Sequence, residues 1–130
     1  MRIIRHYQEQ DKPVLTEMER IEGIEESGMC FEDNPTMVLE DDKKVIGFFT
    51  LRKQHNFPML QHFCISREHR SPKNARLLIK SFKEVCKQLK FNKVIIPSMD
   101  KKLEKMIQYY FKTKPYAFLE NKTFFLVKLF

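Results

Sequence analysis

Apolar residues recur along the chain with two different periods, and the change of period predicts a succession of strands and helices. Short runs with period two, or continuous apolar runs bounded by turn residues, predict strands over 1–7, 36–39, 45–51, 59–65, 93–96, 116–119 and 123–130. Spacings of three and four predict helices after Asp11, over 74–90, and after Ser98 or Asp100. The order β-α-β-β-β-α-β-α-β-β predicts one mixed α/β domain over 1–130, with a central sheet and flanking helices.

The helices are predicted to be amphipathic. The face of the first helix that we expect to be buried carries Val14, Leu15, Met18 and Ile21. The long helix shows a longer apolar stripe, formed by Ala75, Leu78, Phe82, Val85 and Leu89 and flanked by Leu77, Ile79 and Cys86. The strands before and after this helix should pair in parallel, through a right-handed crossover.

Composition and cysteine spacing predict a cellular compartment and exclude some classes of protein. Hydrophobic residues make up 42% and aromatic residues 12%, which is typical of a folded domain rather than a disordered chain. No apolar run approaches the roughly 20 residues of a membrane helix, and the first residues are too polar for a signal peptide. Cys30, Cys64 and Cys86 lack C-x-x-C spacing, so we expect reduced thiols in a cytoplasmic protein and no metal site. Cys64 is expected in the core of its strand.

The formal net charge of +7 is distributed unevenly. Twelve of the 17 acidic residues lie between Glu9 and Asp42, whereas 20 of the 24 basic residues follow from Lys43 onward. This asymmetry favours an anionic partner for the second part of the chain, such as a coenzyme, a nucleotide or a nucleic acid. The alternative is that lysines on exposed helix faces only maintain solubility.

The strongest functional signal is the turn between the strand 59–65 and the long helix. A helix N-terminus offers backbone N–H groups and the positive end of the helix dipole to an anion. Four basic residues surround this turn in the sequence, namely Arg67, Arg70, Lys73 and Arg76. The pattern therefore predicts a phosphate-binding turn.

The element order and several motifs resemble the GCN5-related N-acetyltransferase (GNAT) family, which transfers an acetyl group from acetyl-coenzyme A to an amine. The resemblance covers almost the whole chain. Residues 38–48 (VLEDDKKVIGF) are similar to the second and third strands of the family, and 63–70 (FCISREHR) resemble the fourth strand and the coenzyme turn. The segment 107–111 (IQYYF) resembles the aromatic pair of the last helix. The implied fold is the acyl-CoA N-acyltransferase fold.

The resemblance implies acetyl-CoA as co-substrate, without a metal. The coenzyme motif of the family (Gln/Arg-x-x-Gly-x-Gly/Ala) appears as 70–75, RSPKNA, in which Arg70 and Ala75 match. Lys73 stands where the family has glycine, and Pro72 removes an N–H donor. The implied coenzyme-binding residues are Phe63 and Ile65, through backbone groups, together with Arg70, Ser71, Lys73, Asn74, Ala75 and Arg76.

The family uses a base on the fourth strand and a tyrosine on the last helix. Between Met59 and Ile65 the titratable side chain is that of His62, whose ordinary pKa suits a general base. Tyr110 best matches the tyrosine that protonates the leaving thiolate. Each residue also has a structural interpretation: His62 as part of a polar sheet face, and Tyr110 as a continuation of an apolar helix stripe.

Two functions remain open at this point. The first is an acetyltransferase whose amine-bearing acceptor, cationic if it enters near the acidic segment 25–33, meets a coenzyme A thioester. The second is a non-enzymatic GNAT-like interaction protein, of the kind that phages encode, with a basic surface for an acidic partner. No motif for sequence-specific nucleic-acid recognition is found, and no membrane contact is expected. A homodimer could form if the edge of the apolar strand 124–130 is open.

Overall fold

The structure is a computed structural model that describes residues 1–22, 31, 33–52, 58–98, 101–119 and 122–129. The strands are β1 (Arg2–His6), β2 (Thr36–Asp41), β3 (Lys44–Arg52), β4 (Met59–Ile65), β5 (Lys93–Ser98), β6 (Ala117–Leu119) and β7 (Lys122–Lys128). The α-helices are α1 (Lys12–Glu22), α2 (Pro72–Gln88) and α3 (Lys101–Phe111), and the 3-10 helices are η1 (Glu9–Asp11) and η2 (Arg67–His69). None of the helices in these ranges is long and apolar enough to cross a membrane.

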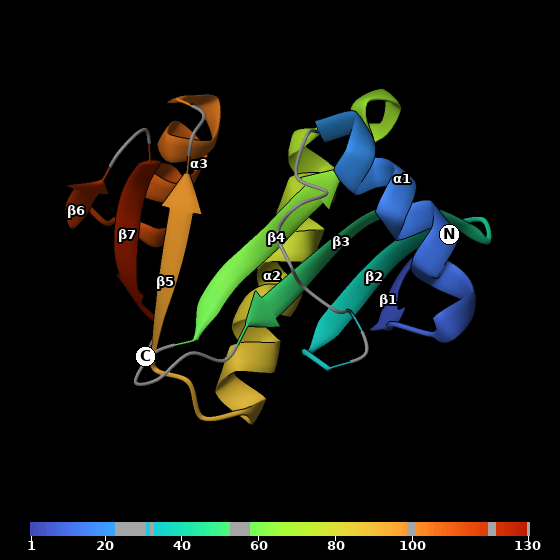
Figure 1. The fold of residues 1–130 in the computed structure, drawn as a ribbon, viewed down its shortest axis with the longest axis horizontal. Helices are drawn as coiled ribbons and strands as arrows, with labels where there is room; N and C mark the ends of the chain where they lie inside the picture. The colour runs from blue at the N-terminus through green and yellow to red at the C-terminus, as the bar shows by residue number, and fades with distance from the viewer. Residues whose placement is uncertain (23–30, 32, 53–57, 99–100, 120–121, 130) are drawn as a thin grey trace.

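The described strands form one mixed sheet in the order β1-β2-β3-β4-β5-β7-β6. Figure 1 shows α1 in front of the half that contains β1–β4 and α2 on the opposite face. The larger core cluster joins α2, α3 and the sheet through buried residues that include Leu78, Phe82, Ile107 and Phe125. A smaller cluster under α1 contains Leu15, Met18, Phe31, Val38, Phe48 and Cys64. The expected mixed α/β fold with helices on both faces is confirmed.

Strand β4 runs antiparallel to β3 and parallel to β5, but its pairing with β5 is brief. The register joins Met59 to Ile95, and Figure 1 shows the two strands diverging from there toward the start of α2. The β3–β4 register passes from Thr50↔His62 to Leu51↔Leu60 and so skips Gln61. An extra residue of this kind is a β-bulge, which bends and twists its strand. The bulge accounts for the divergence of β4 from β5, which opens the sheet beside the predicted coenzyme turn.

Several sequence predictions need correction. The long helix begins at Pro72 rather than Asn74, because Ser71 caps it and proline is well suited to its first position. Ser98 does not cap α3; it is a buried residue of β5. Strand β7 pairs with β5 on one side and with β6 on the other, so it is not the outermost strand of the sheet. Because β6 pairs with β7 only as far as Phe124, a dimer through the edge of β7 stays a prediction for the residues of β7 after Phe124.

The predicted helix faces were rotated by part of a turn. In α1, Val14 and Ile21 are exposed, and Glu19 is buried beside Met18 instead. In α2, Leu89 lies exposed after the helix end, whereas Ile79 and Cys86 are buried with Leu78 and Phe82. Most of the acidic segment 25–33 lies outside the described residues.

Candidate active site

The turn between β4 and α2 is held by a set of local hydrogen bonds. Ser66 Oγ lies 2.8 Å from His69 Nδ1, and the His69 N–H donates to the Ser66 carbonyl at 2.9 Å. Ser71 Oγ accepts a hydrogen bond from the Asn74 N–H at 3.1 Å. Because Pro72 has no N–H, Lys73 carries the remaining donor among the first three helical residues. The turn thus presents one backbone donor and a lysine at the positive end of α2.

Asn74 fixes this turn to the rest of the fold. Its side chain is buried, and its Nδ2 donates to the His69 carbonyl at 2.7 Å. Its Oδ1 accepts a hydrogen bond from Arg2 Nε at 2.6 Å, which ties β1 to the start of α2. A glycine in the family motif permits close approach of the backbone. In this chain the side chains of Asn74 and Ser71 instead hold the turn in one conformation.

Arg70 is engaged by two partners from different elements. Its Nε donates to the carbonyl oxygen of Ile65 at 3.0 Å, and its Nη2 lies 2.7 Å from Glu22 Oε1. The same carboxylate oxygen lies 3.3 Å from Arg67 Nε. The final residue of α1 therefore places a carboxylate between two arginines of the predicted phosphate-binding turn.

The first turns of α2 border a hollow of about 470 Å³, whose lining residues are Lys73, Arg76, Leu77 and Lys80. Arg70, Ser71, Asn74 and Ala75 lie at the same end of α2. Phe63 is half-buried on β4, and Ile65 is buried. The three cations that line the hollow match the charge of an anionic ligand.

His62 lies on the other side of the sheet, under α1. Its side chain is 2% exposed, and its Nε2 is 3.3 Å from Glu19 Oε2, which is also buried. The rings of Phe48 and Phe31 lie 5.7 and 6.1 Å from the imidazole. Burial lowers the pKa of His62 to about 4, although the neighbouring carboxylate acts in the opposite direction. The imidazole is therefore neutral near pH 7, and the same burial makes it a weaker base than an exposed histidine.

Glu19 was not predicted from the sequence, because the family resemblance directed the choice of base to the fourth strand. The signal was present: Glu19 follows Leu15 by four residues and so lies on the same helix face. A carboxylate on an apolar helix face requires a polar partner, because an isolated buried charge is costly. His62 is that partner. Glu22, three residues later, was also not predicted from the sequence, and it contacts Arg67 and Arg70 of the predicted coenzyme turn.

Tyr110 is half-buried on α3, with its ring 5.1 Å from that of the exposed Tyr109. Its carbonyl oxygen accepts a hydrogen bond from Lys83 Nζ of α2 at 3.4 Å. Tyr110 thus lies in the helix layer of α2 and α3, whereas His62 lies on the α1 side. The two predicted catalytic residues therefore lie on opposite faces of the sheet.

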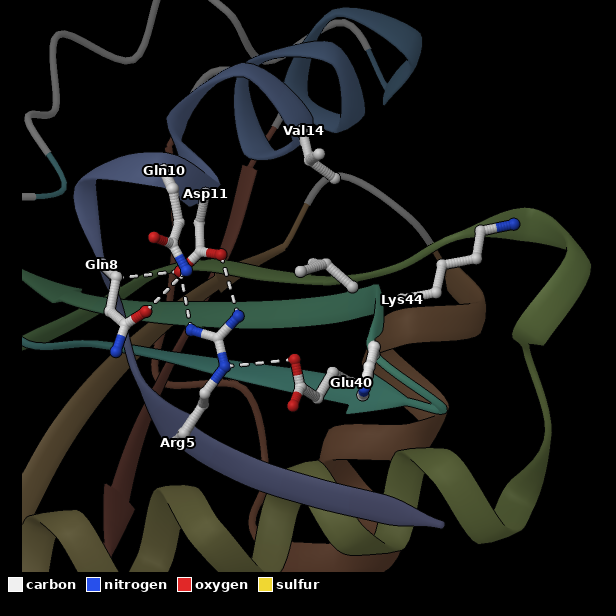
Figure 2. A pocket seen from close by; sticks show the side chains of 9 residues that line it. Arg5, Gln8, Gln10, Asp11, Val14, Glu40 and Lys44 are labelled. Carbon is white, nitrogen blue, oxygen red and sulfur yellow. Dashed lines mark hydrogen bonds and ion pairs between the residues drawn. The ribbon is translucent and has the colours of Figure 1, made fainter.

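A second hollow, of about 710 Å³, lies between β1, the start of α1 and the β2–β3 turn (Figure 2). Its floor is an ion-pair network in which Arg5 donates to both carboxylate oxygens of Asp11 at 2.8 Å and to Glu40 at 3.2 Å. Asp11 also accepts the Gln8 N–H at 2.8 Å. These groups satisfy one another, so we assign them the structural task of joining β1, η1 and β2.

The described residues include two cysteines, and they also show whether side chains gather to bind a metal ion. Cys64 and Cys86 are buried free thiols, and burial raises their pKa values to about 11 and about 12. The prediction that Cys64 is a core residue is confirmed. Within the described ranges, no group of three or more His, Cys, Asp or Glu side chains is arranged to hold a metal ion.

The family model of the acetyltransferase (GNAT) domain matches residues 4–109. The chain belongs to the GNAT family. This match includes the ion-paired Arg5, the buried Glu19–His62 pair and the whole of α2. The predicted family resemblance is thereby confirmed.

Solved structures with the same fold match nearly the whole chain at low sequence identity. The PaiA N-acetyltransferase of Thermoplasma acidophilum, in complex with coenzyme A, has a TM-score of 0.80 and 15% identity, over 98% of this chain and 99% of that one. The ribosomal-protein-S18-alanine N-acetyltransferase of Escherichia coli gives 0.81 and 11%, over 99% and 94%. A GNAT family acetyltransferase of Elizabethkingia anophelis with acetyl-CoA bound gives 0.77 and 10%, over 98% of each chain. No curated protein sequence matches the chain.

Proposed function

We propose that the protein is an N-acetyltransferase that moves an acetyl group from acetyl-CoA to an amine. The observation that carries the proposal is the capped, basic N-terminus of α2, which follows β4 at the point where β4 has parted from β5. A bound anion meets a donor on Lys73, the helix dipole and two further cations there. Membership of the family and coenzyme-bound neighbours support the same ligand.

In this proposal the turn binds the phosphates of the coenzyme. Lys73 and Arg76 contact them with side-chain charge, while Ser71, Asn74 and Ala75 give the turn its shape. Arg70 must exchange its contact with Glu22 for a phosphate oxygen. The backbone of Phe63 and Ile65 flanks the acyl arm along the part of β4 that β5 does not pair with.

His62 and Tyr110 are proposed for the proton transfers. The acyl donor supplies an activated acetyl group as a thioester, and the acceptor amine must lose a proton when its nitrogen attacks. Neutral His62, next to Glu19, accepts that proton, and the resulting imidazolium is stabilised by the carboxylate at 3.3 Å. Tyr110 donates a proton to the leaving thiolate. Glu19 acts through His62 and is a positioning residue.

Calorimetric titration with acetyl-CoA tests the binding part of the proposal. The double variant Arg70→Ala/Lys73→Ala should bind about 30-fold more weakly, equivalent to about 2 kcal/mol for two charged contacts. A matched control is Arg52→Ala/Lys128→Ala, which removes the same charge from exposed strand ends. Equal affinity of wild type and the turn variant would place the coenzyme elsewhere.

The catalytic part needs a separate test, once an acceptor amine supports turnover. His62→Gln should lower kcat and leave acetyl-CoA affinity unchanged, and Glu19→Gln should shift the acidic limb of the pH profile of kcat. Loss of coenzyme binding in either variant would assign the pair to folding rather than to proton transfer.

A second candidate is a non-enzymatic GNAT-like interaction protein. The observation that favours it is the occupied guanidinium of Arg70, which contacts Ile65 and Glu22, in a turn that also contains Pro72 and Lys73. Wild-type protein that fails to bind acetyl-CoA in the same titration would support this candidate. The identity of the acceptor, a cytoplasmic location and a homodimer stay predictions under either function.

A further inference from the structure

We infer that the outer face of α2 binds the phosphate backbone of a nucleic acid, independently of acetyl transfer. Five basic residues lie on this helix and a sixth, Lys90, follows its end, at spacings that alternate between three and four. All six are exposed: Lys73, Arg76, Lys80, Lys83, Lys87 and Lys90. We call them the basic stripe.

The geometry of α2 makes the basic stripe a straight row. Spacings of three and four return a residue to the same side of an α-helix. From Lys73 to Lys87 the row extends about 21 Å, at 1.5 Å per residue, and Lys90 lies past the helix end. The opposite side of the helix is fixed against the sheet by the buried Leu78, Phe82 and Cys86, so the row is held outward on a rigid support.

Charge complementarity selects a regular polyanion as the occupant. Glu84 is the single acidic residue of α2, so cations outnumber it along the row. Protein interfaces usually add apolar or aromatic anchors to their polar contacts. Along the row Leu77 is half-buried, and the exposed Leu89 lies past the helix end. A row of cations without apolar anchors is suited to evenly spaced phosphates, which are bound without reading the base sequence.

The residues of the basic stripe differ in what else they contact. Lys73 and Arg76 belong to the proposed coenzyme site, and Lys83 packs against α3, with its Nζ 5.1 Å from the Phe111 ring centroid. Lys80 borders the same hollow as Lys73 and Arg76, whereas Lys87 and Lys90 have no part in the proposed coenzyme site. Lys87 and Lys90 can therefore be changed to test phosphate-backbone binding while the acetyl-CoA site stays intact.

The test is fluorescence anisotropy with a labelled double-stranded DNA of arbitrary sequence, at about 50 and about 200 mM salt. Five engaged cations, those of the stripe other than Lys83, predict a slope of log K against log salt of about −4.5, which weakens wild-type binding by about 500-fold over this range. The variant Lys87→Gln/Lys90→Gln should reduce the slope to about −2.7. A matched control, Arg52→Gln/Lys128→Gln, removes the same charge from exposed strand positions and should keep the wild-type slope.

Several results would overturn the inference. One is wild-type protein that does not bind DNA at the lower salt, and another is equal weakening in the stripe variant and the control. Polyglutamate that competes as well as DNA at equal charge would show an acidic protein to be the partner instead. Acetyl-CoA affinity, measured in the same variants, should not change, so this inference and the proposed acetyl transfer can fail separately.

Discussion

The ion pair between Arg5 and Asp11 allows a quantitative prediction about stability. Asp11 is 3% exposed and accepts three hydrogen bonds, two from Arg5 and one from the Gln8 N–H. The substitution Asp11→Asn keeps the size of the side chain but removes its charge and one acceptor. Arg5 then retains Glu40 at 3.2 Å as its anionic partner.

We expect Asp11→Asn to lower the free energy of unfolding by about 2 kcal/mol near pH 7. Breaking a buried ion pair costs about 3–5 kcal/mol, and a hydrogen bond to a charged group contributes about 1.5–3 kcal/mol. The expected loss is smaller than the cost of breaking a fully buried pair, because the Arg5 side chain is 23% exposed and keeps Glu40 as a partner. For a chain of this size the loss corresponds to a fall in Tm of about 8 °C.

The direction of the pKa shift of Asp11 determines how the expected loss of stability changes with pH. The hydrogen bonds from Arg5 hold the pKa of Asp11 below its ordinary value. A carboxylate of this kind stabilises the fold above its unfolded pKa of about 3.9, and the contribution is lost as pH falls through the folded pKa. The difference between wild type and Asp11→Asn should therefore be complete near pH 7 and decrease below about pH 4.

Urea unfolding at neutral and acidic pH measures both quantities. Glu17→Gln is the control, because it removes a carboxylate from the exposed pair with Arg20 and should change stability by less than about 0.5 kcal/mol. Refutation would be an Asp11→Asn protein as stable as wild type near pH 7. A difference that is the same at acidic pH would refute the assignment to the charge of Asp11.

Three further predictions concern the site and the core. Glu22→Gln removes the carboxylate that competes with phosphates for Arg70, so calorimetry should show acetyl-CoA binding about 5-fold more tightly; unchanged or weaker binding would contradict this role. Phe82→Ala should cost about 4 kcal/mol in urea unfolding, since Phe82 is fully buried, and a loss below about 1 kcal/mol would contradict the packing. Because burial raises the pKa values of Cys64 and Cys86, both thiols should react slowly with a disulfide reagent near pH 8 and quickly after unfolding in guanidinium chloride.

Hydrophobic periodicity was sufficient to predict the order of elements and the bounds of β4, because each element is a local pattern. It was insufficient for the faces of the helices. Val14 and Ile21 are apolar but exposed, whereas the charged Glu19 is buried, since His62 on a distant strand supplies its partner. No local pattern contains that partner. The bulge at Gln61 leaves no local signal either, because it is defined by the register against β3.

The departures from the family motif at Pro72 and Lys73 also have consequences that depend on residues distant in the sequence. From the sequence they argued for a poorer phosphate-binding turn, since a glycine was replaced and a donor was lost. The structure shows what holds the turn instead: Ser71 caps α2, and Asn74 joins the turn to Arg2 of β1. A turn fixed in this way loses little further freedom when a ligand binds, so rigidity offsets part of the missing donor. For the proposed binding of phosphates, the main obstacle is then the carboxylate of Glu22, which holds Arg70, rather than the altered motif.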